Sequence, residues 1–446
     1  MLNQEACVNS LNFTVPRLGE AKITSPIKMS TKTGDNMANY VRDDEFILYN
    51  IDARPGSYTI EYTSQDLLEK AGPREKIFFS PGHVHAGIVT CGGLCPGLNN
   101  VIRALVRTLW YSYGIHRISG IRNGYRGFLP QYGIPVMPLD PDIVDDIHTK
   151  GGTILGSSRG GADVEAICDS IERMNLNMLF TIGGDGTQHG AFRIAEELER
   201  RNQKISIIGI PKTIDNDLSF IQKSFGFETA VSEAVAAVSS AHTEAHDAIN
   251  GIGLVKVMGR ESGFIAAHTA LAINDVNFVL IPEIDFDLEG EKGLFAALKR
   301  RLELRHHAVI LVAEGAGQRY MESEQQRDLS GNRILGDIGF FLKKAIRDYF
   351  EKQGMETSIK YIDPSYMIRS APANPNDSIY CARLGTHAVH AAMSGRTKTL
   401  ISMVNNTFVH LPIEIAINKR NTVDPEGPLW RDVIGATHQP MLFRND

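Results

Sequence analysis

The stretch Asn177-Met-Leu-Phe-Thr-Ile-Gly-Gly-Asp-Gly-Thr187 is a short apolar run followed by a glycine-rich turn and then by a helical pattern to about Arg201. The stretch Ala86-Gly-Ile-Val-Thr-Cys-Gly-Gly-Leu-Cys-Pro-Gly97 has the same order, with a helix expected near 98–112. Apolar strands that alternate with helices are typical of parallel sheets covered on both faces. The repeated pattern therefore predicts an α/β protein.

Five further apolar runs extend this pattern and are predicted strands: Ile205–Ile210, Ile252–Val257, Phe278–Ile281, Ala308–Ala313 and Thr399–Val404. Residues 1–83 read differently, because they hold turn formers, mixed charges and only short apolar pieces. The length of 446 residues suits two or three packed α/β units. We expect two doubly wound, Rossmann-like domains with parallel-rich sheets and an N-terminal extension.

Composition excludes several classes of protein. An apolar share of 43% and a charged share of 22% exclude a disordered or fibrous chain. The 46 Lys and Arg against 52 Asp and Glu give a net charge of −6, so no nucleic-acid partner is expected. No apolar run approaches the roughly 20 residues that span a bilayer. With no secretory or peroxisomal signal in view, we expect a soluble, cytoplasmic protein.

The cysteines point to a reducing compartment. They are few and odd in number, so no disulfide framework is implied. The pair Cys91 and Cys95 has no second pair at the spacing of a zinc ribbon, and no zinc site is expected there. The five cysteines are Cys7, Cys91, Cys95, Cys168 and Cys381.

The two glycine-rich turns can bind phosphate. Around Gly92 and around Gly183, backbone N–H groups at a helix N-terminus could face an anion, and a Cβ would block its approach. Asp185 adds a carboxylate of the kind that holds a phosphate-bound Mg²⁺. Neither turn has the Gly-Lys-Ser/Thr ending of a Walker A loop. The alternative interpretation is a pair of ordinary tight turns.

A stronger signal is Pro211-Lys-Thr-Ile-Asp-Asn-Asp217, which follows a predicted strand. In an extended segment Thr213, Asp215 and Asp217 would share one face. Two carboxylates on one face are costly unless a cation or a reacting proton lies between them. One could accept a proton from an attacking hydroxyl while the other helps to position a metal, as phosphoryl transfer requires. The alternative is a polar turn with an Asx cap.

Several cationic side chains are suited to bind phosphate. Arg159 is flanked by glycine in 156–160, Arg260 closes Met-Gly-Arg, and Arg369 ends Tyr-Met-Ile-Arg with Lys360 nearby. Arginine is the better bidentate partner of phosphate, although any one of them could be a solvated surface group. Glu314 follows the strand 308–313, at the end where ligands of open α/β sheets bind.

One histidine pair has metal-ligand spacing. His242 and His246 stand four residues apart in a helical pattern. No third ligand is evident in the sequence, so no metal is assigned to them. They are interpreted as surface or packing residues.

Taken in order from about residue 86 to 410, Gly-Gly-Asp-Gly-Thr, Pro-Lys-Thr-Ile-Asp-Asn-Asp and Met-Gly-Arg resemble the phosphofructokinase family. The first 80 or so residues, and Tyr-Met-Ile-Arg, resemble the plant, trypanosomatid and protist branch of its ATP-dependent members. The resemblance implies a nucleotide-binding domain over 84–226, completed by about 368–410, and a sugar-phosphate-binding domain over 227–367. Residues 1–83 are the extension and 411–446 a C-terminal segment.

The resemblance also assigns roles. It makes Asp215 the base on the fructose 1-hydroxyl, with Arg159 and Thr213 as further catalytic residues, and it makes Asp185 and Asp217 the metal residues. The nucleotide would contact Gly92, Arg159, Gly160, Gly183, Gly184, Asp185, Gly186 and Thr187. The sugar phosphate would contact Thr213, Ile214, Asp215, Met258, Gly259, Arg260, Glu314, Lys360, Tyr366, Met367, Ile368 and Arg369.

Two positions depart from the bacterial ATP-dependent pattern, and a third separates this chain from the pyrophosphate-using relatives. Lys212 stands where bacterial ATP-dependent members carry Gly, and it is typical of pyrophosphate-using relatives. Those relatives usually carry Asp where this chain has Gly186, so the combination resembles the plant and protist ATP-dependent branch. The arginine that bacterial members supply across a subunit boundary aligns near Gly251 and is missing. Subunit-shared substrate binding and allosteric control of the bacterial kind are therefore not implied.

The implied function is the Mg²⁺-supported, ATP-dependent phosphorylation of fructose 6-phosphate to fructose 1,6-bisphosphate, a committed step of glycolysis. The main alternative is a pyrophosphate-dependent enzyme. More distant alternatives are an NAD- or lipid-kinase-like enzyme, which shares Gly-Gly-Asp-Gly-Thr, and a non-catalytic subunit that senses sugar phosphate. The family expectation for assembly is a homotetramer, with a dimer as the alternative.

Overall fold

The computed structural model describes residues 12–49, 51, 67–161, 163–321 and 334–445. The chain forms two compact units. Unit 1 comprises Met1–Thr213, Leu218–Phe225 and Pro372–Arg420, and unit 2 comprises Ile214–Asp217, Gly226–Ala371 and Asn421–Asp446. This division differs from the expected ranges at 214–217, which join unit 2, and at 411–446, which both units share.

Unit 1 is built on a seven-stranded sheet in the order β15-β14-β9-β8-β5-β6-β7. The five central strands run parallel, and β7 and β15 at the two edges are antiparallel to their neighbours. The central strands are buried almost throughout, as expected for a sheet covered on both faces. The strands are β5 (His85–Thr90), β6 (Arg117–Ile121), β7 (Met137–Pro138), β8 (Met178–Gly183), β9 (Ser206–Pro211), β14 (Thr399–Val404) and β15 (Thr407–Pro412).

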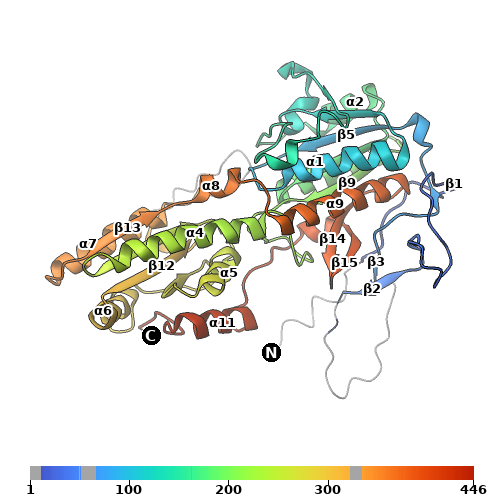
Figure 1. Ribbon diagram of the computed structural model, residues 1–446. Coiled ribbons are helices and arrows are strands. Elements are labelled where there is room, and N and C mark those ends of the chain that lie inside the picture. The colour runs from blue at the N-terminus through green and yellow to red at the C-terminus, as the bar shows by residue number, and fades with distance from the viewer. Residues whose placement is uncertain (1–11, 50, 52–66, 162, 322–333, 446) are drawn as a thin grey trace. The chain divides into compact units, whose positions relative to one another are not determined.

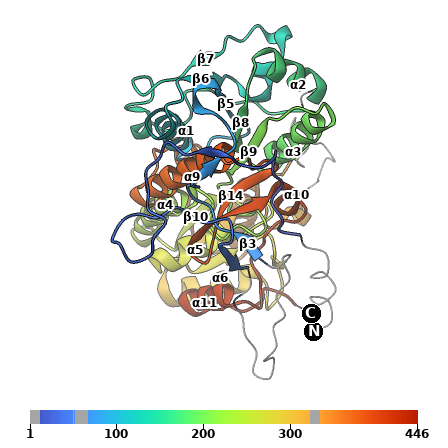
Figure 2. The same ribbon diagram turned by 90° about the vertical axis from the view of Figure 1, so that its right-hand side faces the viewer.

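Helices cover both faces of this sheet. Figure 1 shows α1 and α9 side by side, and Figure 2 shows them across the sheet from α3 and α10. A π-helical turn at Thr108–Ser112 continues α1, so the helix predicted near 98–112 is present. The helices of unit 1 are α1 (Leu98–Arg107), α2 (Val164–Arg173), α3 (Asp185–Arg200), α9 (Pro375–Met393) and α10 (Ile413–Ile417).

Unit 2 has a fully parallel sheet in the order β11-β12-β10-β13. Side chains alternate across it, so Val255 and Val257 of β10 pack toward one core while Ile252 and Leu254 pack toward the other. Its strands are β10 (Gly251–Val257), β11 (Phe278–Leu280), β12 (His307–Ala313) and β13 (Ser358–Ile362). Its helices are α4 (Phe227–His246), α5 (Phe264–Ile273), α6 (Leu294–Arg305), α7 (Ile338–Lys352), α8 (Ser365–Ser370) and α11 (Pro428–Thr437).

The described part of the N-terminal extension belongs to unit 1 and forms two small ladders. In these, β1 (Ile23–Thr24) pairs with β4 (Lys76–Ile77) and β2 (Phe46–Leu48) pairs with β3 (Leu67–Glu69), all antiparallel. A bridge between Lys70 and Val409 places β3 beside the edge strand β15. The extension therefore covers one edge of the seven-stranded sheet, and covering an edge keeps it from pairing with another chain.

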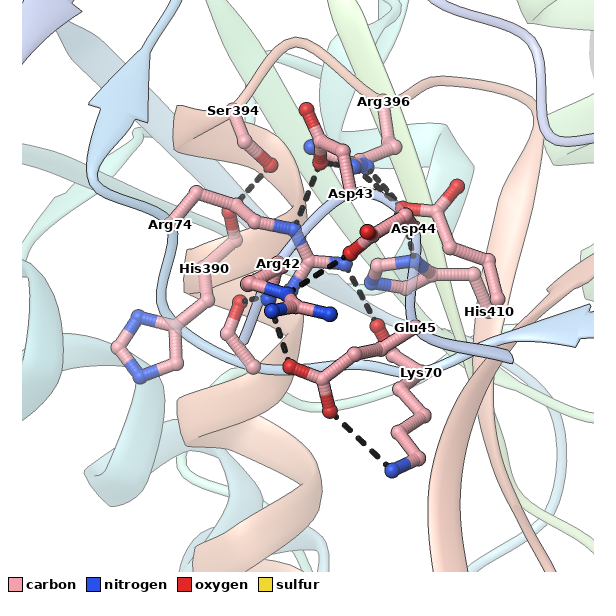
Figure 3. Close-up of polar contacts among 12 residues, drawn as sticks. Arg42, Asp43, Asp44, Glu45, Lys70, Arg74, His390, Ser394, Arg396 and His410 are labelled. Atoms are coloured by element: carbon pink, nitrogen blue, oxygen red, sulfur yellow. Dashed lines mark hydrogen bonds and ion pairs between the residues drawn. The ribbon is translucent and has the colours of Figure 1, made fainter. Parts of the chain in front are cut away.

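A buried ionic cluster fixes the extension in place (Figure 3). The Arg74 guanidinium donates to Glu69 at 3.0 Å and to Asp43 at 2.9 Å, and Arg396, from the loop after α9, donates to the same two carboxylates. The Arg396 side chain is only 1% exposed. Burial raises the pKa of Glu69, but His410, Arg396 and Arg17 outweigh it and hold that pKa well below its usual value. Removing one partner of such a buried pair is strongly destabilising, by about 3–5 kcal/mol.

The predicted fold class is confirmed, and each of the seven apolar runs is a strand within one or two residues of its predicted bounds. The weaker strands β6, β13 and β15 were not predicted. None of the helices in the described part of the chain combines the length and apolar composition that a membrane crossing requires. Cys91, Cys95, Cys168 and Cys381 are free thiols and buried, while Cys7 lies outside the described residues.

Candidate active site

The two glycine-rich turns lie next to each other in unit 1. β5 and β8 are parallel neighbours whose last pairing joins Thr90 to Ile182, so both chains leave the sheet at the same edge. The Cys91 N–H then donates to the Ile182 carbonyl at 2.9 Å. After β5 the backbone turns at Gly92 with φ 86°, a conformation that favours glycine. After β8, helix α3 begins within two residues.

Lys212 joins the two turns. It follows β9, which pairs with β8 on the side away from β5. The Lys212 backbone N–H donates to the Gly183 carbonyl at 3.0 Å. Its ammonium group donates to the Gly93 carbonyl at 2.8 Å, and the residue is only 8% exposed. The predicted donor-specificity residue therefore lies between the two predicted phosphate-binding turns.

The segment 156–160 completes this group. The Gly92 N–H donates to the Ser158 carbonyl at 3.1 Å, and the Ser157 hydroxyl donates to the Gly92 carbonyl at 2.5 Å. The exposed Arg159 guanidinium lies 3.3 Å from where a Cβ on Gly93 would stand. Three segments far apart in sequence thus bring the predicted nucleotide-binding residues of unit 1 together. Ser157 was not predicted.

Two glycines of the second turn have different roles. A Cβ on Gly183 would collide with the Thr187 side chain, so this glycine is required by the packing of α3 on β8. A Cβ on Gly186 would meet nothing within 4 Å, and Gly186 is exposed in the first turn of α3. The fold therefore does not require glycine at 186. A ligand that occupies the space beside it would explain the absence of a side chain.

Asp185 is the first residue of α3, where the positive end of the helix dipole favours a carboxylate. Its oxygens lie 3.7 Å from the Arg420 guanidinium and 3.5 Å from the His189 imidazole. His189 was detectable as the i+4 neighbour on α3, whereas Arg420 is 235 residues away and gave no signal. Among the described residues, no three His, Cys, Asp or Glu side chains are arranged to hold a metal ion. One accessible carboxylate still fits Mg²⁺, which takes most of its ligands from phosphates and water.

The predicted extended conformation of 211–217 is wrong. Ile214 and Asp215 form a turn, and Asn216 takes the left-handed conformation with φ 55°, so Thr213, Asp215 and Asp217 do not alternate along one face. Asparagine tolerates that conformation better than most residues. The chain passes from unit 1 to unit 2 after Thr213, and Asp215 and Asp217 belong to unit 2.

Asp215 is the most perturbed carboxyl group of this site. Burial raises its pKa from 3.8 to about 7, assisted by the negative charges of Asp217 and Glu314. The Arg369 charge and the Arg260 backbone N–H act in the opposite direction. The Ser262 hydroxyl, which was not predicted, donates to the Asp215 backbone carbonyl at 3.2 Å. A pKa near 7 suits a group that must accept a proton at neutral pH.

The ends of β10 and β12 present the neighbouring predicted residues. These strands pair in parallel, and the Glu314 and Gly315 N–H groups donate to the carbonyls of Val257 and Gly259, each at 2.9 Å. Gly259 has φ 127°, and a Cβ there would meet the Ser262 carbonyl. Glu314 follows β12 directly. The negative charge of Glu314 lies close enough to raise the pKa of Asp215.

Two carboxylate oxygens of this cluster are buried and accept no hydrogen bond from the described residues. They are Asp215 Oδ1 and Glu314 Oε1. An unpaired buried acceptor destabilises the folded protein, typically by about 1–3 kcal/mol. Hydroxyl groups of a bound polyol would satisfy both.

The predicted residues of 358–370 are divided. Ile368 is buried in the core of unit 2, and Arg369 acts on Asp215. Tyr366 and Met367 are 83% and 70% exposed. Lys360 forms an ion pair with Glu244 on α4 at 3.2 Å. Its contribution to substrate binding stays a prediction.

Comparison with known proteins agrees with this geometry. The family described as Phosphofructokinase matches residues 85–392. The chain is 55% identical over 445 residues to the ATP-dependent 6-phosphofructokinase of Borreliella burgdorferi, with 98% of both chains covered. It is 50% identical to ATP-dependent 6-phosphofructokinase 7 of Arabidopsis thaliana over 84% of this chain and 77% of that one. The ATP-dependent enzyme of Trypanosoma cruzi is 47% identical over 82% and 76%.

Solved structures are similar at the level of the fold. The pyrophosphate-dependent phosphofructokinase of Marinobacter aquaeolei matches 81% of this chain and 92% of its own, with a TM-score of 0.65 and 21% identity. Phosphofructokinase of Pichia pastoris in the T-state matches 79% of this chain and 37% of its own, with a TM-score of 0.61 and 20% identity. The family match over residues 85–392, together with full-length identity above one half, shows that this chain belongs to the phosphofructokinase family.

Proposed function

We propose that the protein transfers the γ-phosphoryl group of ATP to the 1-hydroxyl of fructose 6-phosphate, giving fructose 1,6-bisphosphate and ADP in glycolysis. One observation carries the chemical part of the proposal. Asp215 is a buried carboxylate with a pKa of about 7 and an unpaired oxygen, beside a second unpaired carboxylate oxygen on Glu314. This arrangement suits a base that accepts a proton from a sugar hydroxyl. The naming of relatives that are 44–55% identical over nearly the whole chain supports ATP as the donor.

In the proposed mechanism, the sugar phosphate binds to unit 2. Arg260 and Arg369 neutralise its phosphate, because arginine binds phosphate oxygens in a bidentate manner. Glu314 accepts a hydrogen bond from a ring or chain hydroxyl. Asp215 then takes the proton of the 1-hydroxyl as that oxygen attacks the phosphoryl group.

The nucleotide is proposed to bind the glycine turns of unit 1, with the backbone N–H groups of the second turn at the phosphates. Lys212 supplies a fixed positive charge between the turns. Asp185 is proposed to hold the Mg²⁺ that accompanies ATP, which neutralises charge on the transferred group. The open space at Gly186 supports a nucleotide rather than pyrophosphate.

Two further expectations remain predictions. A homotetramer is proposed as the assembly, with a dimer as the alternative. The four buried free thiols suit the proposed cytoplasmic location, because a reducing compartment keeps thiols free.

An aldolase-coupled assay tests the proposal with ATP and with pyrophosphate as alternative donors. We expect turnover with ATP and fructose 6-phosphate, and its loss in the Asp215→Asn variant. Turnover with pyrophosphate alone would overturn the choice of donor. A folded protein inactive with both donors would overturn the function and favour a sugar-phosphate-sensing subunit.

A further inference from the structure

Three histidines come together in unit 2, away from the residues assigned to catalysis. His242 and His246 lie one helical turn apart at the C-terminal end of α4, and His307 is the first residue of β12. The ring centroid of His307 is 5.4 Å from that of His242 and 5.2 Å from that of His246. The two α4 rings are 6.3 Å apart. The structure thus supplies the third imidazole that the sequence did not reveal.

All three rings have the same nitrogen engaged. Nδ1 of His242 lies 3.2 Å from a carboxylate oxygen of Asp275, and Nδ1 of His246 lies 3.4 Å from one of Asp247. Nδ1 of His307 lies 3.0 Å from the Arg305 carbonyl. These oxygens can only accept, so the three contacts favour the tautomer that carries the proton on Nδ1. In a neutral imidazole the lone pair is then on Nε2.

That pattern is how proteins prepare histidines for metal. A ligating histidine usually donates its other N–H to a carboxylate or a backbone carbonyl, which fixes its tautomer. Finding it on three rings that face one another is a stronger signal than the i, i+4 spacing alone.

The ring separations are compatible with one ion. An ion bound by imidazole nitrogens at about 2.0–2.1 Å lies roughly 3.2 Å from each ring centroid, so two ligands at a tetrahedral angle have centroids about 5.2 Å apart. The described residues contain no three ligand side chains already arranged to hold an ion, and this triad is no exception. Modest ring rotation would be needed, and it is feasible because the His246 and His242 side chains are 66% and 29% exposed.

We propose that His242, His246 and His307 bind a divalent transition-metal ion through their Nε2 atoms, with water as a further ligand. Imidazole suits Zn²⁺, Cu²⁺, Ni²⁺ and Co²⁺, whereas Mg²⁺ prefers oxygen. The site is therefore chemically separate from the Mg²⁺ proposed at Asp185. Its occupant would link the end of α4 to the start of β12.

The surrounding charges set the strength of the site. Asp275 and Asp247 favour a cation. Arg301, whose guanidinium donates to the His307 carbonyl at 3.3 Å, opposes one. The balance indicates an exchangeable ion rather than a permanently bound one.

The test uses the metal-free full-length chain without nucleotide. Co²⁺ is titrated while its visible d–d absorption is followed, and Zn²⁺ binding is measured by calorimetry at pH 7.5. One equivalent is expected to bind, with a nitrogen-ligand Co²⁺ spectrum and a higher melting temperature of unit 2. His307→Asn should abolish that equivalent, and Asp275→Asn should weaken it about 10- to 100-fold.

His306 provides the matched control. It is the exposed neighbour of His307, has φ 62°, and belongs to no histidine contact of this cluster, and asparagine tolerates its backbone conformation. His306→Asn should therefore leave the equivalent intact. Unchanged Zn²⁺ affinity in His307→Asn, equal losses in both variants, or no Zn²⁺ binding by the wild type would overturn the proposal.

Discussion

Replacing Asp215 with asparagine is expected to stabilise unit 2 at pH 8 while removing most activity. The native pKa of about 7 lies above the ordinary value of 3.8, so the folded state is penalised whenever this carboxyl is ionised. The difference of about 3 pKa units corresponds to at most about 4 kcal/mol. The contribution of Asp215 to stability is present below pH 3.8 and is lost as the pH rises through 7. Asparagine, which carries no charge, avoids that loss.

The expected gain in the free energy of unfolding of unit 2 therefore depends on pH. At pH 8 it approaches about 4 kcal/mol, and at pH 5 it falls below about 2 kcal/mol, because only the unfolded carboxyl is then ionised. Unit 2 can be followed selectively, since the protein has two tryptophans and Trp430 of α11 lies in unit 2. Denaturant unfolding of a Trp110→Phe background, with and without Asp215→Asn, measures the difference.

Activity supplies the second measurement. A general base contributes about 10²- to 10⁴-fold, so kcat of the asparagine variant should fall by at least that factor although the protein is more stable. In the wild type, kcat/KM should rise through pH 7 as Asp215 ionises. Glu314→Gln removes a neighbouring negative charge and should shift this limb to lower pH, while the titration of the substrate phosphate stays the same.

Each result can fail separately. An asparagine variant that is less stable at pH 8 would refute the burial argument. Near-normal kcat in that variant would remove Asp215 from the mechanism. A pH limb that Glu314→Gln leaves in place would show that the limb belongs to the substrate.

Three further outcomes are expected. Gly186→Asp should fold normally, because a Cβ there meets nothing within 4 Å. It should lose most ATP-dependent turnover, whereas Gly186→Asn should retain more. Unchanged ATP kinetics in the aspartate variant would contradict the donor assignment. Arg369→Ala should raise KM for fructose 6-phosphate about ten- to a hundredfold with little change for ATP, and Arg431→Ala, which removes an exposed arginine of unit 2 paired with Asp432, should serve as its inert control. Burial lowers the pKa of three histidines of unit 1 to about 3–4. Their contribution to the stability of unit 1 is therefore present above the unfolded pKa of about 6.5 and should fall by about 4 kcal/mol in total by pH 5.5. Trp110 fluorescence in a Trp430→Phe background measures this loss. These histidines are His387, His390 and His410.

The central strands and the glycine turns were predictable because their signals are local. A fully buried parallel strand reads as a continuous apolar run, and β8 or β12 needs no partner to be recognised. β13 was missed because it is an edge strand, half-buried along its length, and its sequence Ser-Ile-Lys-Tyr-Ile lacks a continuous run. The turn at 214–215 was missed because a run of polar residues does not reveal that Asn216 adopts the left-handed conformation.

The candidate site was only partly predictable for a different reason. Residue types and strand ends indicated Asp215 and Glu314, and residue type indicated Arg369. The perturbation of Asp215 depends on burial, on its neighbour Asp217 and on charges from two other segments. The site residues are also contacted by Ser262, two residues after the Met-Gly-Arg motif, and by Arg420, from a stretch without a recognised motif. Their positions follow from tertiary packing.

The histidine cluster is a specific case of this limit. The i, i+4 pair on α4 is visible in the sequence, but His307 is a ligand candidate only because β12 pairs with β10 in a register that aligns His307 with Gly251, just after α4 ends. A shift of that register by one residue would turn the imidazole to the opposite face of the sheet. The register is fixed by the alternating apolar residues of both strands, which pack into two separate cores. The apolar pattern of unit 2 therefore determines that three polar rings meet at the N-terminal ends of its inner strands β10 and β12.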